Sequence, residues 1–180
     1  MRRCFVICED RPREARPLRF LLASLARHCP AAAVRLYYPP ADDDLAAWID
    51  TLPGVVLRRD WPGEAGAGWN VKPDALLDTL ADFDEAVWLD SDLVLAGDIR
   101  PLVDAPAETV AVAEEPAKTP FAGDAADRCR AWGWPVGRPL AQINSSVLRL
   151  TRRHLGLLAP RSGRRRRPCA GATGSVDHGR

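Results

Sequence analysis

The chain has 180 residues, 47% of them hydrophobic, which is enough for one domain with a substantial core. Its formal net charge of +1 excludes a molecule-wide field that would recruit nucleic acid or an anionic membrane. No stretch approaches the ~18 uninterrupted apolar residues of a membrane span. The five cysteines contain no CxxC pair, which argues against a disulfide framework or a zinc site and fits a reducing cytoplasm.

Strands and helices alternate along the first half of the chain. Short apolar runs predict strands, and leucines spaced three and four residues apart predict helices. In chain order we expect a strand at 4–8, a helix at 16–29, a strand at 32–39, a helix at 42–52, a strand at 54–59, a loop at 61–69 and a helix at 72–83. This alternation is typical of parallel strands joined by crossover helices.

The second half is less regular. We expect a strand ending at Leu89, another from Thr109, a helix or lid at 121–134 and a last strand at 143–150. The arginine-rich segment 161–180 has no hydrophobic periodicity and is predicted to be disordered. It is a solvated tail, a basic arm that contacts phosphates, or an out-of-frame terminus. We therefore predict a domain over 1–160 and a basic tail over 161–180.

The segment "VWLDSDLVLAGDI" carries the chemistry, because its two aspartates follow an apolar strand. Ligand sites in parallel sheets lie beyond the carboxyl ends of the strands, where Asp90 and Asp92 fall. In an extended chain, residues two apart point to one side about 7 Å apart. Such a pair can hold one Mn²⁺ or Mg²⁺ ion; a solvated turn is the alternative. The other DxD triplets, at 42–44 and 82–84, are predicted to be helix caps or surface loops.

The segment 68–102 resembles the core of nucleotide-sugar glycosyltransferases of the A-type fold, particularly family eight, which includes glycogenin and bacterial lipopolysaccharide glycosyltransferases. The resemblance covers most of 2–150 and consists of a lysine before the strand, "LDSD" followed by "GDI", and a later "NSS". It implies an α/β fold: a three-layer α/β/α, Rossmann-like arrangement around a mixed, mostly parallel sheet. It also implies metal-dependent transfer of a sugar, with retention of configuration, from a nucleotide diphosphate donor, UDP in this family, to an unknown acceptor.

The resemblance assigns Asp90 and Asp92 to a manganese or magnesium ion that bridges the donor's diphosphate. A bound cation stabilises the charge that develops on the leaving phosphate. Lys72 matches the family's lysine and is implied to contact the phosphates or the donor sugar. Its alternative is a surface lysine in the first turn of a helix.

Three further residues are implied to bind the donor. Asn144 and Ser145 match an Asn-Ser pair beside the donor sugar, although Asn144 could equally be a satisfied polar group at a strand start. Glu9 follows the first strand, where the family contacts the base and ribose. A solvated turn is the alternative for Glu9.

The sequence departs from the family pattern in its last part. Ser146 stands where the family usually has glycine, and neither the Asp-Gln motif nor the late metal-binding histidine is recognisable. His178 lacks the family surroundings, and His154 is predicted to be an ordinary surface histidine. No catalytic residue or third protein ligand is therefore assigned.

Two other functions remain open. One is a non-catalytic or fragmentary nucleotide-binding domain. The other is a haloacid-dehalogenase-type phosphatase, which also places DxD at the end of an apolar strand, although normally near the start of its domain.

Overall fold

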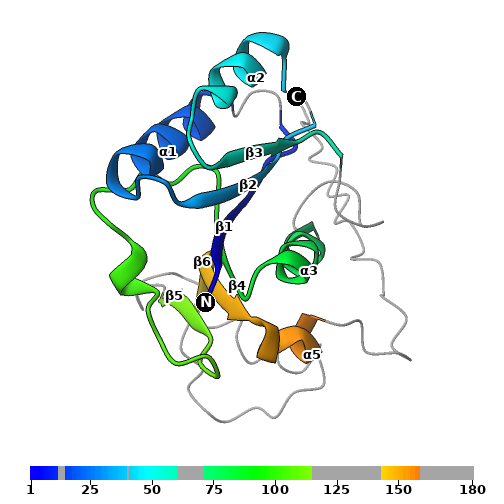
Figure 1. Cartoon of the computed structure of the whole chain (residues 1–180), viewed down its shortest axis with the longest axis vertical. Helices are drawn as coiled ribbons and strands as arrows, with labels where there is room; N and C mark the ends of the chain where they lie inside the picture. The colour runs from blue at the N-terminus through cyan, green and yellow to red at the C-terminus, as the bar shows by residue number, and fades with distance from the viewer. Residues whose placement is uncertain (12–14, 40, 61–70, 115–142, 159–180) are drawn as a thin grey trace, which may run out of the picture.

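Figure 1 shows the computed structural model, which describes residues 1–11, 15–39, 41–60, 71–114 and 143–158. The predicted loop at 61–69, helix or lid at 121–134 and tail at 161–180 lie outside these ranges. The described elements are β1 (Arg3–Cys8), α1 (Ala15–His28), β2 (Ala33–Tyr37), α2 (Asp43–Asp50), β3 (Val55–Arg58), α3 (Val71–Asp82), β4 (Glu85–Leu89), the 3-10 helix η2 (Arg100–Leu102), β5 (Ala111–Glu114), β6 (Ile143–Thr151), the 3-10 helix η4 (Arg152–His154) and α5 (Leu155–Leu158). Each strand and helix that the sequence predicts within these ranges is present, with ends shifted by a few residues.

The strands form one six-stranded sheet in the order β3-β2-β1-β4-β6-β5. Parallel pairs join β3 to β2, β2 to β1 and β1 to β4. β6 runs antiparallel to both β4 and β5. The predicted mixed, mostly parallel sheet is therefore confirmed.

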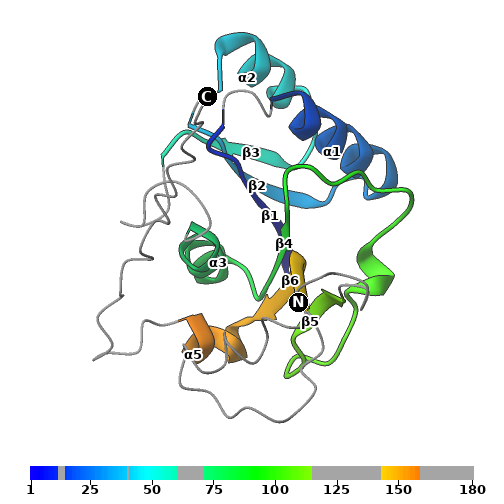
Figure 2. The same ribbon diagram turned by 180° about the vertical axis from the view of Figure 1, so that it is seen from behind.

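Helices cover both faces of this sheet (Figures 1 and 2). On one face, the apolar stripe of α1 packs with α2 residues against β1, β2 and β4 in one buried cluster. On the other face, α3 packs against β1 and β4 in a second cluster. β4 lies between these two layers and is buried along its whole length, which explains its nearly continuous apolar sequence.

Polar contacts fix α3 against β2. The Tyr37 hydroxyl donates to Asp78, and Arg35 donates to Asp78 Oδ2 over 2.9 Å and to Asp82 Oδ2 over 2.6 Å. Burial, followed by the neighbouring Asp78 carboxylate, raises the pKa of Tyr37, so its hydroxyl stays a donor. These contacts hold the helix whose first turn carries Lys72.

A buried ion pair closes the sheet at the end where β4 begins. Glu85 and Arg149 are both fully buried, and Arg149 Nη2 lies 3.0 Å from Glu85 Oε2. Arg149 also donates to the carbonyl oxygens of Ala105, Pro106 and Thr109. The guanidinium therefore anchors the segment before β5.

His154 shows that one prediction was wrong. The residue is 7% exposed rather than on the surface. Its Nδ1 accepts the Thr151 amide hydrogen over 3.0 Å, and its Nε2 lies 3.1 Å from the Glu108 carbonyl oxygen. Nδ1 thus caps the end of β6 and Nε2 contacts the segment before β5. The sequence pattern missed this because capping by histidine has no strong sequence signature.

The other two DxD triplets have the structural roles that the sequence predicts. Asp42 accepts the amide hydrogen of Leu45 over 2.8 Å and caps α2. Asp82 pairs with Arg35, and Asp84 accepts the backbone amide of Arg2 over 2.8 Å. Among the described residues, no helix is long and apolar enough to cross a membrane.

Candidate functional site

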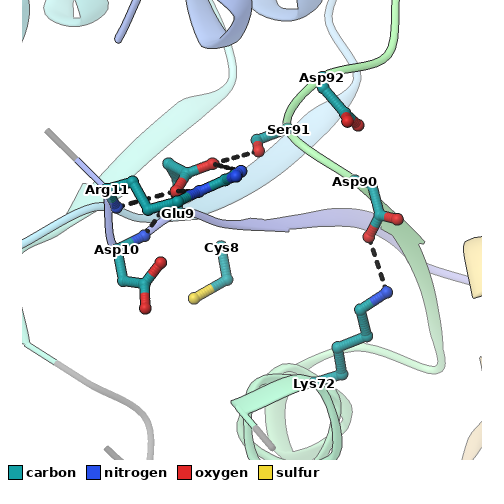
Figure 3. Close-up of a pocket in the computed structure, with 8 residues that line it drawn as sticks. All are labelled: Cys8, Glu9, Asp10, Arg11, Lys72, Asp90, Ser91 and Asp92. Atoms are coloured by element: carbon teal, nitrogen blue, oxygen red, sulfur yellow. Dashed lines mark hydrogen bonds and ion pairs between the residues drawn. The ribbon is translucent and has the colours of Figure 1, made fainter. Parts of the chain in front are cut away.

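A pocket of about 400 Å³ opens where β1 and β4 end. Two strand ends, the turn after β4 and the first turn of α3 form it (Figure 3). This is the edge of the sheet where parallel α/β folds bind ligands. The lining residues are Cys8, Glu9, Asp10, Arg11, Lys72, Asp90, Ser91 and Asp92.

The turn after β4 separates its three polar side chains. The Asp90 amide donates to the Ser146 carbonyl oxygen over 2.9 Å, and the Leu93 amide donates to the Asp90 carbonyl oxygen over 3.3 Å. In Figure 3, Ser91 points toward Glu9, while the Asp90 and Asp92 carboxylates lie on the other side of the turn. The chain turns rather than staying extended, yet both aspartates still line one pocket.

Asp90 is held by two donors. Its Oδ1 accepts from Lys72 Nζ and from Trp88 Nε1, each over 2.7 Å. The Lys72 ammonium also lies 5.1 Å from the centre of the Trp88 ring, a cation–π distance. The surface-lysine alternative for Lys72 is wrong, because its side chain is only 18% exposed and paired with the first aspartate.

Trp88 has a polar role that the sequence analysis missed. It is 2% exposed and belongs to the core beside α3. Its indole nitrogen nevertheless reaches Asp90, two residues further along. The signal was available, because residues two apart on a strand project from the same face.

Of the Asn-Ser pair, Ser145 alone contacts Lys72 among the described residues. Lys72 Nζ donates to the Ser145 hydroxyl over 3.0 Å and to the Ser145 carbonyl oxygen over 3.2 Å. Asn144 Oδ1 instead accepts the Ser146 amide hydrogen over 2.8 Å, a local contact within β6 that satisfies this oxygen. Ser145 therefore belongs to the Lys72–Asp90 group, and Asn144 stands one residue outside it.

Glu9 is buried at 3% exposure, so its alternative as a solvated turn is wrong. Its Oε1 accepts from the Asp10 amide, the Arg11 amide and Arg11 Nε over 2.8 to 3.0 Å. Its Oε2 accepts from Arg11 Nη2 over 2.9 Å and from the Ser91 hydroxyl. Burial raises the pKa of Glu9, but the hydrogen bonds from Arg11 and Ser91 outweigh it and lower the pKa overall. Glu9 is an ionised brace between β1 and the turn, and its contact with a donor stays a prediction.

The pocket carries an excess of negative charge. Four of its lining residues are carboxylates and two are cations. Arg11 neutralises Glu9 and Lys72 neutralises Asp90. The side chains of Asp10 and Asp92 have no hydrogen bond within the described part of the chain. These two uncompensated carboxylates favour a cation over a bare anion.

The carboxylate oxygens of the turn fit a hard divalent cation whose remaining ligands come from a phosphate. Asp92 is exposed and its oxygens are available, and Asp90 Oδ2 makes no hydrogen bond to the described residues. No group of three His, Cys, Asp or Glu side chains within the described ranges converges on one ion. Mg²⁺-type sites commonly have one or two carboxylates completed by substrate phosphates and water.

Cys8 contributes neither a ligand nor a nucleophile at neutral pH. Burial, and then the carboxylates of Asp10 and Glu9, raise the pKa of its thiol to about 12. The thiol is therefore protonated in the pocket. Within the described ranges Cys4, Cys8 and Cys29 are all free, and the predicted cytoplasmic location stays a prediction.

No protein-family model matches the sequence, and no curated protein matches it. Solved structures do match. The glycosyltransferase GlyE of Streptococcus pneumoniae is 19% identical with a TM-score of 0.55, and the match covers 87% of this chain and 36% of GlyE. The galactosyltransferase LgtC, solved with donor and acceptor sugar analogues, is 18% identical with a TM-score of 0.58, covering 82% of this chain and 57% of LgtC.

A third match is the mannosyltransferase PcManGT of Pyrobaculum calidifontis, solved with GDP-Man and Mn²⁺. It is 15% identical with a TM-score of 0.53, and the match covers 88% of this chain and 46% of PcManGT. The chain thus has the A-type glycosyltransferase fold, as the sequence resemblance implied. It spans between about a third and three fifths of the length of these three proteins.

Proposed function

We propose that this chain binds a nucleotide diphosphate sugar through a divalent cation held by Asp90 and Asp92, and that it belongs to an enzyme that transfers the sugar to an acceptor. The observation that carries the proposal is the pairing of this acidic turn with Lys72 at the ligand-binding edge of an A-type fold. The solved structures with donor analogues and with GDP-Man and Mn²⁺ support the same ligand class.

The charge of the pocket supports metal dependence. A diphosphate brought alone into a pocket with two uncompensated carboxylates is repelled. A divalent cation held by Asp90 and Asp92 would cancel the excess of two negative charges in the pocket, and it would supply electrostatic stabilisation of the negative charge that develops on the leaving diphosphate. Trp88 orients the Asp90 carboxylate, and Glu9 holds Ser91 between the two aspartates.

The donor contacts follow from the same arrangement. Lys72 supplies a point charge to the phosphates, and Ser145 and Asn144 offer polar groups on the β6 side. We propose UDP as the nucleotide, on the basis of the family resemblance, and GDP as the alternative nucleotide. The residues that bind an acceptor lie outside this proposal.

A second candidate is a domain that binds the donor without transferring the sugar. The observation that favours it is the metal site, because within the described residues no third His, Cys, Asp or Glu side chain joins Asp90 and Asp92 on one ion. The haloacid-dehalogenase alternative loses support, because GlyE, LgtC and PcManGT are glycosyltransferases and the DxD turn follows the fourth described strand.

The test is calorimetric titration of UDP and of GDP into the protein with and without Mn²⁺. We expect Mn²⁺-dependent binding that is lost in Asp90→Asn and in Asp92→Asn. Asp44→Asn is the matched control, because it alters the second aspartate of another DxD triplet, on α2. Nucleotide binding that does not depend on Mn²⁺, or that is retained in both Asp90→Asn and Asp92→Asn, would refute the proposed donor site.

Activity is tested separately with UDP-sugars and GDP-mannose. Release of nucleotide that depends on Asp90 supports transfer or hydrolysis of the donor. Tight Mn²⁺-dependent binding with no release supports the second candidate. Hydrolysis of phosphate monoesters that depends on Asp90 would instead favour the phosphatase.

A further inference from the structure

The Lys72 ammonium is ion-paired with Asp90, one of the two proposed ligands of the cation. Its three hydrogens are matched by three acceptors, namely Asp90 Oδ1 at 2.7 Å, the Ser145 hydroxyl at 3.0 Å and the Ser145 carbonyl oxygen at 3.2 Å. An ammonium has three donors, so no hydrogen remains for a phosphate oxygen in this arrangement. A role for Lys72 in phosphate binding therefore requires it to leave at least one of these partners.

We infer, on the basis of the proposed function, that Lys72 is an exchangeable counter-ion. It neutralises Asp90 while the donor is absent, and it passes to the diphosphate when a divalent cation takes its place on Asp90. Both positive charges compete for one carboxylate, so each weakens the binding of the other to it. The diphosphate resolves this competition, because it offers the displaced ammonium a new anionic partner.

The surroundings of Lys72 suit such an exchange. Trp88 donates to Asp90 Oδ1 independently of Lys72, so the carboxylate keeps its orientation when the ammonium leaves. The Lys72 side chain is 18% exposed and the Asp90 side chain 32%, so the pair lies at the pocket rather than sealed in the core. Departure of Lys72 also frees the Ser145 hydroxyl, one of the groups proposed to contact the donor.

One substitution distinguishes this exchange from ordinary phosphate binding by Lys72. The exchange predicts that the substitution strengthens Mn²⁺ binding and weakens UDP binding. Lys72→Met removes the charge and keeps an unbranched apolar stem beside Trp88. We expect Mn²⁺ alone to bind this variant roughly two- to fivefold more tightly than it binds the wild type, because the variant lacks the competing ion pair. We expect UDP, at saturating Mn²⁺, to bind roughly tenfold more weakly.

Two further variants serve as controls in the same titrations. Lys72→Arg keeps the charge and should not tighten Mn²⁺ binding. Arg153→Met removes a positive charge from an exposed residue of η4. This helix directly follows Thr151, which pairs with the first residue of β4, whereas Asp90 follows the last residue of β4. Arg153→Met should change neither affinity, so any long-range charge effect is measured directly.

The outcomes distinguish this inference from the proposed function. Tighter Mn²⁺ binding together with weaker UDP binding in Lys72→Met supports the exchange. Detectable Mn²⁺ binding in Lys72→Met but not in the wild type supports it as well. Unchanged or weaker Mn²⁺ binding in Lys72→Met overturns the exchange, and so does the absence of Mn²⁺ binding from both proteins. The proposed donor site then still stands if UDP binds with Mn²⁺ and requires Asp90.

Discussion

Ser91 is predicted to hold the acidic turn in place without touching any ligand. Its hydroxyl donates to Glu9 Oε2, and the side chain lies between Asp90 and Asp92 in sequence while pointing away from them. Ser91→Ala removes that hydrogen bond and leaves the four other donors to Glu9, three of them from Arg11. The Glu9 charge therefore stays paired in the variant.

The structure sets the size of the effect. A hydrogen bond to a charged group contributes about 1.5 to 3 kcal/mol, and the lower end applies because Glu9 keeps its ion pair. A loss of about 1.5 kcal/mol lowers the melting temperature of a chain of this size by roughly 3 to 6 °C. Residues that orient metal ligands typically change metal affinity by about 10- to 100-fold, so Mn²⁺ and UDP together should bind at least tenfold more weakly.

Differential scanning calorimetry and calorimetric titration measure the two quantities. Ser146→Ala is the matched control, because its hydroxyl makes no hydrogen bond within the described residues and its backbone contact to Asp90 is retained. A Ser91→Ala protein with wild-type Mn²⁺-dependent affinity would refute the positioning role, whatever its melting temperature. A loss of affinity equal to that of Ser146→Ala would refute it too.

Two further predictions concern the buried ion pair and the pocket thiol. Arg149→Met should cost about 3 kcal/mol in unfolding free energy, measured by urea denaturation, because among the described residues it leaves buried Glu85 with Arg3 as its one remaining cation. Adding Glu85→Gln to this variant should recover part of the loss, and equal stability of the single and double variants would contradict the reasoning. Cys8, with its pKa raised to about 12, should react with iodoacetamide at pH 7.5 roughly 100-fold more slowly in the native protein than in urea. Peptide mass mapping follows the reaction, and similar rates in both states would show that the thiol is not suppressed.

The sequence predicted the fold better than the contacts within the site. Period-2 and period-3.6 patterns reveal strands and helices, and the apolar run AVWL in β4 indicated a strand covered on both faces. The edge holding Asp90 and Asp92 follows from the same reasoning, because ligand sites lie where parallel strands end, whereas Lys72 was assigned through the family resemblance. The end of β1 enters the same pocket through its pairing with β4.

The partners of each side chain could not be predicted in this way. Glu9 and Ser91 are 82 positions apart in sequence, and Lys72 and Ser145 are 73 apart. Such pairings depend on strand register and on the rotation of α3, which periodicity does not encode. His154 was misjudged for a related reason, because its burial results from contacts with the segment before β5 rather than from its own local pattern.

The small number of protein ligands has a consequence for how metal and donor bind. Two carboxylates, one of them already paired with an ammonium, hold a divalent cation weakly by themselves. A diphosphate supplies further oxygen ligands and at the same time draws Lys72 away from Asp90, so each ligand raises the affinity for the other. Thermodynamic linkage requires this enhancement to be equal in both directions. The factor by which Mn²⁺ tightens UDP binding should therefore equal the factor by which UDP tightens Mn²⁺ binding, and Lys72→Met should reduce both factors together, because it removes the competition that the diphosphate relieves.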